Sequence, residues 1–145
     1  MSASTILKSH QFGRQSTYLE DPDIVFMKLA GMVSLEEARS INEVHLEYAK
    51  DVEYFFYLID LSELEDLPAS VRKEASEVVK LLPLRGTVVV NAPLRAKVLA
   101  KLLLTAANLF RKGQQKNPVM FADSEAEGRD LILKQRRYVT EEAVA

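Results

Sequence analysis

Two kinds of hydrophobic periodicity alternate along this chain, and they predict strands and helices in turn. Several short stretches are rich in apolar, β-branched or aromatic residues, which is typical of strands. Residues 53–60 contain six consecutive aromatic or aliphatic positions without polar alternation, so we expect a central strand buried on both faces. The predicted strands are residues 15–20, 24–30, 53–60, 86–90 and 118–122.

Apolar residues at helical spacing predict a helix in each interval after the second strand. Ser34 and Glu37 form a capping-box pattern that marks one helix start, and Ser124 and Glu127 repeat it. Between them, apolar positions recur every three or four residues with charged positions on the other side. Pro83 ends one of these helices. The predicted helices are residues 34–50, 71–82, 93–112, closed by Gly113, and 124–137.

This order of elements predicts an α/β fold. Strands that alternate with helices through short connections favour a mostly parallel sheet built by right-handed crossovers. The first two strands are joined by the turn Asp21-Pro22-Asp23, so we expect them to form an antiparallel hairpin. We therefore expect a single sheet of about five strands packed by four helices. The expected organisation is a flexible N-terminus over residues 1–9, one domain over 10–138 and a C-terminal tail over 139–145.

Composition supports one ordinary globular domain. The chain has 145 residues, 48% hydrophobic and 28% charged, and a formal net charge of −2. A nearly neutral chain has no general attraction for nucleic acid, and no nucleic-acid partner is expected. Cysteine is absent, which excludes disulfides and thiol nucleophiles. We find no apolar run of signal-peptide or membrane-span length, so we expect cytoplasmic residence without stable membrane insertion.

The acidic stretch after the central strand is the main candidate for acid–base chemistry. We expect the strand to stop at Asp60 and to be followed by a turn that carries Ser62, Glu63, Glu65 and Asp66. Crowded carboxylates raise one another's pKa, as a general acid requires. Acidic residues ahead of a helix also favour its positive end, and an exposed corner is polar in any case. We therefore expect a structural corner and no catalytic residue.

Cofactor and metal chemistry lacks the usual signals. The five glycines are scattered singly, so no phosphate-binding loop is predicted. The two histidines, His10 and His45, are not spaced as a ligand pair. We expect His45 to lie at the boundary of the core, satisfied by a neighbour or by water. No metal or cofactor is expected.

The helix within residues 94–110 is more apolar than one core-facing stripe requires. It lies in a basic segment, residues 84–116, that has seven Lys and Arg residues and no Asp or Glu. We expect Val98 and Leu104 toward the edges of its core face or beyond. Such surplus indicates a partner surface, a homodimer contact or the wall of an apolar pocket. Deep burial and contact with an anionic bilayer remain as alternatives. The residues expected to fill the core are Leu99, Leu102, Leu103, Ala106 and Phe110.

Three stretches resemble the SpoIIAA-like group of the STAS superfamily. They are Phe-Tyr-Leu-Ile-Asp-Leu-Ser-Glu-Leu at 56–64, Pro-Leu-Arg-Gly-Thr-Val-Val-Val at 83–90 and Ala-Lys-Val-Leu-Ala-Lys-Leu-Leu-Leu at 96–104. The resemblance covers about residues 16–137. It implies a bacterial, cytoplasmic, non-enzymatic module that regulates through protein–protein contacts.

Many members of this group are switched by phosphorylation of a serine at the start of the helix that follows the Asp-Leu-Ser corner. Aligned on that corner, Pro68 takes the place of the motif's aspartate and Ala69 the place of the serine. The usual switch residue is therefore missing, and Ser70 is the next hydroxyl.

We thus carry three functional hypotheses. The first is a STAS-like binding or regulatory module with a protein partner. The second is a carrier of a small apolar ligand or lipid, because the group is also similar to the lipid-carrying CRAL-TRIO fold. It predicts a groove between residues 71–82 and 94–110. The third is an enzyme that uses the strand-end carboxylates. The expected partner or ligand surface comprises Asp60, Ser62, Leu67, Pro68, Ala69, Ser70, Val98, Lys101 and Leu104.

Overall fold

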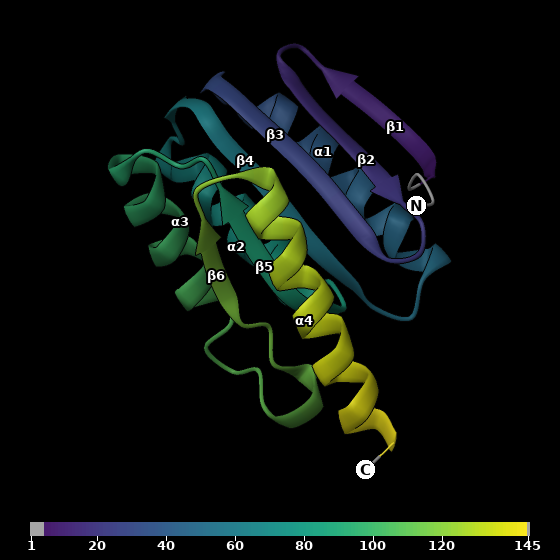
Figure 1. The fold of residues 1–145 in the computed structure, drawn as a ribbon. Helices are drawn as coiled ribbons and strands as arrows, with labels where there is room; N and C mark the ends of the chain where they lie inside the picture. Colours follow the sequence, from purple (N-terminus) through teal and green to yellow (C-terminus); the bar gives the residue numbers. More distant parts are fainter. Residues whose placement is uncertain (1–4, 145) are drawn as a thin grey trace.

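Six strands form one sheet in which neighbours follow the order of the sequence (Figure 1). The computed structural model describes residues 5–144. The first three strands pair antiparallel, and the last three continue parallel to the third. The predicted mixed sheet with an N-terminal hairpin is confirmed. The strands are β1 (Ile6–Phe12), β2 (Gln15–Glu20), β3 (Ile24–Met32), β4 (Phe55–Asp66), β5 (Leu84–Val90) and β6 (Val119–Ala122).

Three of the four helices cover the same face of the sheet. α1 (Leu35–Tyr48), α2 (Ala69–Leu81) and α3 (Leu94–Ala107) each connect two neighbouring parallel strands. Right-handed crossovers along a sheet whose order never reverses place all their helices on one side. α4 (Glu125–Val144) follows the last strand and lies on the opposite face, in front of the sheet in Figure 1. Two short 3-10 helices, η1 (Ala49–Asp51) and η2 (Gly113–Gln115), complete the chain.

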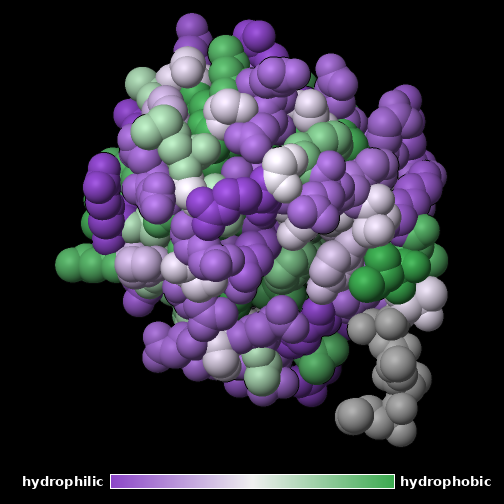
Figure 2. Space-filling view, turned by 90° about the horizontal axis from the view of Figure 1, so that it is seen from above, coloured by the Kyte–Doolittle hydropathy of each residue, from purple (hydrophilic) through white to green (hydrophobic). Residues whose placement is uncertain are grey.

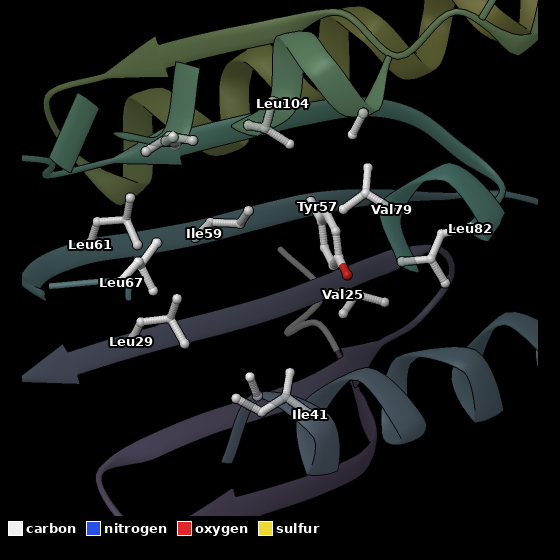
Figure 3. Packing of buried hydrophobic residues seen from close by; sticks show 14 of the residues in the cluster. Val25, Leu29, Ile41, Tyr57, Ile59, Leu61, Leu67, Val79, Leu82 and Leu104 are labelled. Carbon is white, nitrogen blue, oxygen red and sulfur yellow. The ribbon is translucent and has the colours of Figure 1, made fainter. Parts of the chain in front are cut away.

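β4 supplies the centre of both core layers, as the absence of polar alternation in its first half predicts. Tyr57 and Ile59 belong to the cluster under α1, α2 and α3. Phe56 and Leu58 point to the other face and pack with Ile132 of α4. Figure 3 shows part of the first cluster. The sheet therefore separates a broad three-helix layer from a narrow one-helix layer.

Both ends of the chain are more regular than expected. Residues 6–9, expected to be frayed, form part of β1, where Lys8 Nζ lies 2.7 Å from an oxygen of Asp51. At the other end, α4 continues through residues 138–144 instead of ending near 137. Val139 is buried against the sheet, which explains this extension. Residues 1–4 and 145 lie outside the described residues.

The predicted acidic turn after Asp60 is wrong, because β4 continues to Asp66. Ala30 pairs with Glu63 and Gly31 with Leu64, after a register shift in the β3–β4 ladder. Leu61 and Leu64 remain buried while the acidic side chain of Glu65 is exposed. The residues between 60 and 66 are thus an extension of the parallel pair and not a connection.

The core face of α3 also differs from the prediction. Small residues, Ala96, Ala100 and Ala107, face the sheet together with Leu104. Leu102, Ala106 and Phe110, expected in the core, are exposed. Small side chains let the helix approach its neighbours closely. The helix therefore turns its alanines toward the sheet, although burying Leu102 and Phe110 would remove larger side chains from water. The helix ends at Ala107, before the expected Lys112, and Gly113 begins η2.

Candidate functional site

A cavity of about 80 Å³ lies between the sheet and the three-helix layer, and it is partly open to solvent. Its floor is formed by β3, β4 and β5, and its walls by α1, α2 and α3 with the segment before α2. Figure 3 shows several of its side chains converging from strands and helices. The apolar lining residues include Leu29, Ile41, Ile59, Leu61, Leu67, Val71, Val79, Val89, Leu103 and Leu104.

Alanines on the surrounding helices leave this space. Ala38 of α1, Ala75 of α2 and Ala100 of α3 line the cavity at positions where a longer side chain would fill it. Interiors are normally packed without voids larger than a water molecule. A cavity bordered by one alanine from each helix is therefore a local departure from ordinary packing, and it is a natural place for a ligand.

Polar groups reach the cavity from one side only. Among its 18 lining residues, Asn42, His45 and Tyr57 are polar and none is charged. Asn42 and His45 lie one turn apart on α1, and Tyr57 faces them from β4. The site is thus apolar with one polar end.

His45 forms the centre of a buried hydrogen-bond chain. Its Nδ1 lies 2.7 Å from the hydroxyl of Tyr57, and its Nε2 lies 2.8 Å from Thr17 Oγ1. The Thr17 hydroxyl donates to the carbonyl oxygen of Phe26 at 2.6 Å. A hydroxyl has one hydrogen, so Thr17 accepts from His45 Nε2–H, and Tyr57 donates to the bare Nδ1. The chain fixes one neutral tautomer.

Electrostatics agree with this assignment. Burial lowers the pKa of His45 to about 3, with a smaller contribution from His10. Burial also raises the pKa of Tyr57 above its ordinary value. Both groups are therefore neutral near pH 7. The expected boundary position of His45 is wrong, since the side chain is fully buried, although neighbours do satisfy it.

Asn42 supplies an unused donor. Its Nδ2 is buried and has no hydrogen-bond partner in the described part of the chain. Such a group ordinarily costs about 1–3 kcal/mol when left unpaired, so its presence in a cavity wall favours a ligand or water as partner. The polar end thus offers the free amide NH2 group of Asn42 and the remaining lone pairs of the Tyr57 hydroxyl.

The residues predicted as one surface fall into separate places. Leu67 and Leu104 are buried and line the cavity, so Leu104 does not lie at the edge of the core face of α3 where it was expected. The other residues lie outside the cavity, where Asp60 Oδ1 accepts from the backbone N–H of Ser62 at 2.8 Å. Three positions at the start of α2 and two on the outer side of α3 remain exposed or half-buried: Pro68, Ala69 and Ser70, and Val98 and Lys101.

Among the acidic residues of β4, Glu63 has a lowered pKa, whereas a general acid requires a raised one. Glu63 lies 2.8 Å from the ammonium of Lys28, whose hydrogen bond and charge lower the pKa of Glu63. Asp66 accepts from the backbone N–H of Leu67. In the described residues, no three His, Asp or Glu side chains lie where they would hold one metal ion.

Sequence reasoning missed the polar end of the cavity. Thr17, Asn42 and Tyr57 come from three separate elements, and no spacing in the sequence connects them. A tyrosine in a strand expected to be buried on both faces was the available signal, because a buried hydroxyl needs a partner.

Comparison with known proteins identifies the fold. No family model matches the chain, and no curated protein matches it. Among solved structures, an uncharacterized protein of the DUF3478 family from Shewanella loihica PV-4, described as having a SpoIIAA-like fold, superposes with a TM-score of 0.54. The match covers 90% of this chain and 96% of that chain at 15% sequence identity. The fold is SpoIIAA-like.

This match confirms the resemblance seen in residues 56–64, 83–90 and 96–104 at the level of fold. A SpoIIAA-like fold hosts different functions, so the activity has to be argued from the site. In the part of the chain that the structure describes, no helix combines the length and apolar character needed to cross a bilayer.

Proposed function

We propose that this SpoIIAA-like chain is a non-enzymatic binding protein whose cavity holds a small, neutral, largely apolar ligand. The observation that carries the proposal is an apolar cavity between the sheet and three helices, with an unpartnered amide N–H in its wall. Leu67, Val71 and Val79 on one side and Leu103 and Leu104 on the other line it, as the carrier hypothesis expects of a groove between α2 and α3.

The lining restricts the charge of the ligand. An ionised carboxylate loses its hydration on entering an apolar site and needs a cation in return. No lysine or arginine is among the lining residues, and His45 is neutral with both nitrogens engaged. A neutral alcohol, ketone, aldehyde or ester therefore fits better than a fatty-acid anion.

The polar end restricts the functional group. Asn42 Nδ2 donates and needs an acceptor oxygen, whereas Tyr57 already uses its hydrogen on His45 and presents only lone pairs. An alcohol both accepts and donates, so it offers a partner to each group. A water molecule requires roughly 10–15 Å³ on this scale, so 80 Å³ suits a short aliphatic chain or a small ring.

Binding of a matched pair of probes tests this function. We expect 1-hexanol to shift the NMR methyl signals of Ile59, Val79 and Leu104. Hexanoate at neutral pH should bind at least about tenfold more weakly than 1-hexanol. Ala75→Leu should fill the cavity and abolish the shifts. Ala126→Leu, the same change at an exposed position of α4, is the control. Absence of binding by both probes, or equal binding in Ala75→Leu, would refute the proposal.

A regulatory protein–protein module is the second candidate. It is supported by the exposed corner at the start of α2, where Ala69 and Ser70 are accessible. Ala69 cannot accept phosphate, so recognition there would be constitutive or would use Ser70. A photo-crosslinking residue at position 70 should capture a heterologous protein in cells, whereas one at the exposed Glu141 should not. Equal capture at both positions would count against this candidate.

A further inference from the structure

α3 has a second apolar face that points away from the sheet. Leu94, Val98 and Leu102 are 78%, 50% and 66% exposed. Residues four apart lie above one another on a helix, so these three form one continuous stripe. Leu109 and Phe110, in the turn that follows the helix, are 66% and 81% exposed and extend the apolar surface. We call these five residues the α3 stripe.

Cations border the stripe on both sides. At 100° per residue, Arg95 falls at one edge of the stripe, and Lys97 and Lys101 fall at the other. Arg95 and Lys101 are exposed and Lys97 is half-buried. Residues 84–116 contain no Asp or Glu, but Arg95 lies 3.7 Å from a carboxylate oxygen of Asp66, which precedes this segment, so the positive border of the stripe depends on Lys97 and Lys101. In Figure 2, hydrophilic side chains cover most of the face, and hydrophobic atoms protrude at its left edge, the side on which Figure 1 shows α3.

A second copy of the chain is a poor occupant of this surface. In a twofold contact, the same patch meets itself, so the basic edges of both copies would come together. With no acidic residue in residues 84–116 to pair with them, Lys97 and Lys101 would repel their counterparts. The stripe is also a ridge on a helix, and a ridge requires either a matching groove or a deformable surface.

We propose that the α3 stripe docks reversibly on the surface of an anionic lipid bilayer. Apolar side chains on one line of a helix with lysines at its borders are typical of helices that lie in the bilayer interface. Leu94, Val98 and Leu102 would reach the acyl boundary, while Lys97 and Lys101 extend their ammonium groups to the lipid phosphates. The contact is peripheral and involves no insertion of a whole helix.

Docking in this way would place the cavity beside a source of apolar molecules. Leu104 lines the cavity from the inner face of α3, about half a turn beyond the outer residue Leu102. The same helix would therefore separate lipid from ligand. The docking surface stands on exposure and charge alone and does not require the proposed ligand.

Vesicle flotation tests the proposal with the whole chain. We expect binding to phosphatidylcholine vesicles that contain about 30% phosphatidylglycerol, weak or no binding to phosphatidylcholine alone, and loss of binding as salt increases. Lys97→Gln and Lys101→Gln should each weaken binding about fivefold. Leu102→Ser should weaken it about tenfold or more.

Leu133→Ser is the matched control, because Leu133 is 48% exposed on α4, on the other face of the sheet. It should bind like the unmodified chain, and thermal unfolding should show that both serine variants are folded. Equal loss in Leu102→Ser and Leu133→Ser, or no binding to anionic vesicles at low salt, would overturn the proposal. A dimer that Leu102→Ser dissociates, or an acidic protein that binds the stripe in place of vesicles, would also overturn it. Ala75→Leu, which fills the cavity, should still bind anionic vesicles like the unmodified chain, because docking does not require the ligand.

Discussion

At the scale of single residues, the neutral His45 is the most informative feature of the site. Its two nitrogens are committed to Tyr57 and Thr17, which are themselves buried. If His45 were protonated, both of its nitrogens would carry a hydrogen, and Nδ1–H would need an acceptor where the Tyr57 hydroxyl now donates. The cavity lining also contains no carboxylate to balance the positive charge. The arrangement thus stabilises the protein only while this ring is uncharged.

Acid should therefore destabilise the fold through His45. The pKa is about 3 in the folded chain against an ordinary 6.5. Between these two pH values, His45 binds a proton in the unfolded chain and not in the folded one, so acid shifts the equilibrium toward the unfolded state. The stabilisation is complete above pH 6.5 and is lost as pH falls from 6.5 toward 3, by up to about 1.4 kcal/mol per pH unit. Urea unfolding at successive pH values should show this slope, and His45→Gln should reduce it. An unchanged slope in the variant would contradict the assignment.

Tyr57→Phe should cost stability even though the ring remains. The change removes the one donor to His45 Nδ1 that residues 5–144 supply, and it leaves that buried nitrogen without a partner among them. We expect a loss of about 1–3 kcal/mol in the free energy of unfolding. Tyr138→Phe, at a tyrosine that is 60% exposed, should leave stability unchanged within about 0.5 kcal/mol. Similar losses in the two variants would show that the hydrogen bond is not responsible.

At the scale of elements, the contact of α4 with the sheet depends on one missing side chain. A Cβ at Gly128 would lie 2.5 Å from Val90 Cγ1, and 3.2 Å from Val88 Cγ1 on the same strand. Glycine there lets the helix backbone rest directly on β5. This approach explains why a glycine is tolerated inside a helix, where it ordinarily costs about 1 kcal/mol relative to alanine.

Gly128→Ala should accordingly destabilise the protein by about 1–3 kcal/mol, because α4 must move away from the sheet. Helix propensity alone predicts the opposite sign, a gain of about 1 kcal/mol. Chemical denaturation of the two proteins decides between the two effects. An increase in stability would mean that α4 is packed more loosely than the distances indicate.

The elements that the sequence predicted best are those with a single clear periodicity. The capping box of Ser34 and Glu37 is present with both hydrogen bonds, and β4 is buried on both faces as expected. β1 was missed because it lies at the edge of the sheet and is exposed through most of its length, so it has no buried stripe to detect. Edge strands often lack the pattern that identifies central ones.

Two further misses have physical causes that periodicity does not register. The extension of β4 is interrupted by register shifts near Ala30 and Met32, which break the alternation of period two. α3 has more apolar residues than one face requires, and the choice of its inner face depends on how closely it approaches α2 and the sheet. The same difficulty affected the prediction of the site, because Leu104 was expected at the edge of the helix face and instead lines the cavity.

At the scale of the whole molecule, two arginines of α4 join the C-terminal helix to the first half of the sheet. Arg129 donates to both oxygens of Glu20 at 2.8 and 2.9 Å, and Arg136 binds Asp23. Glu20 is 4% exposed, so the two hydrogen bonds from Arg129 replace contacts with water at its carboxylate. The pairs connect positions more than 100 residues apart.

Removing one partner should therefore affect the entire fold. Arg129→Met leaves the Glu20 carboxylate buried and unpaired, and we expect a loss of about 3–5 kcal/mol in the free energy of unfolding. Arg137→Met, at an exposed position of the same helix, should change stability by less than about 1 kcal/mol. Calorimetric melting of both variants measures the difference, and comparable melting temperatures would argue against a structural role for the pair.

The close contact between α4 and β5 also determines which side of the sheet can open transiently. Because there is no room for even a Cβ between Gly128 and Val90, that side is rigid, and a bound ligand should not change the rate at which its amide protons exchange with solvent. Transient opening is then expected in α1, α2 and α3, each of which contributes an alanine to the cavity wall. A bound ligand should slow deuterium uptake in these three helices and leave uptake in α4 unchanged.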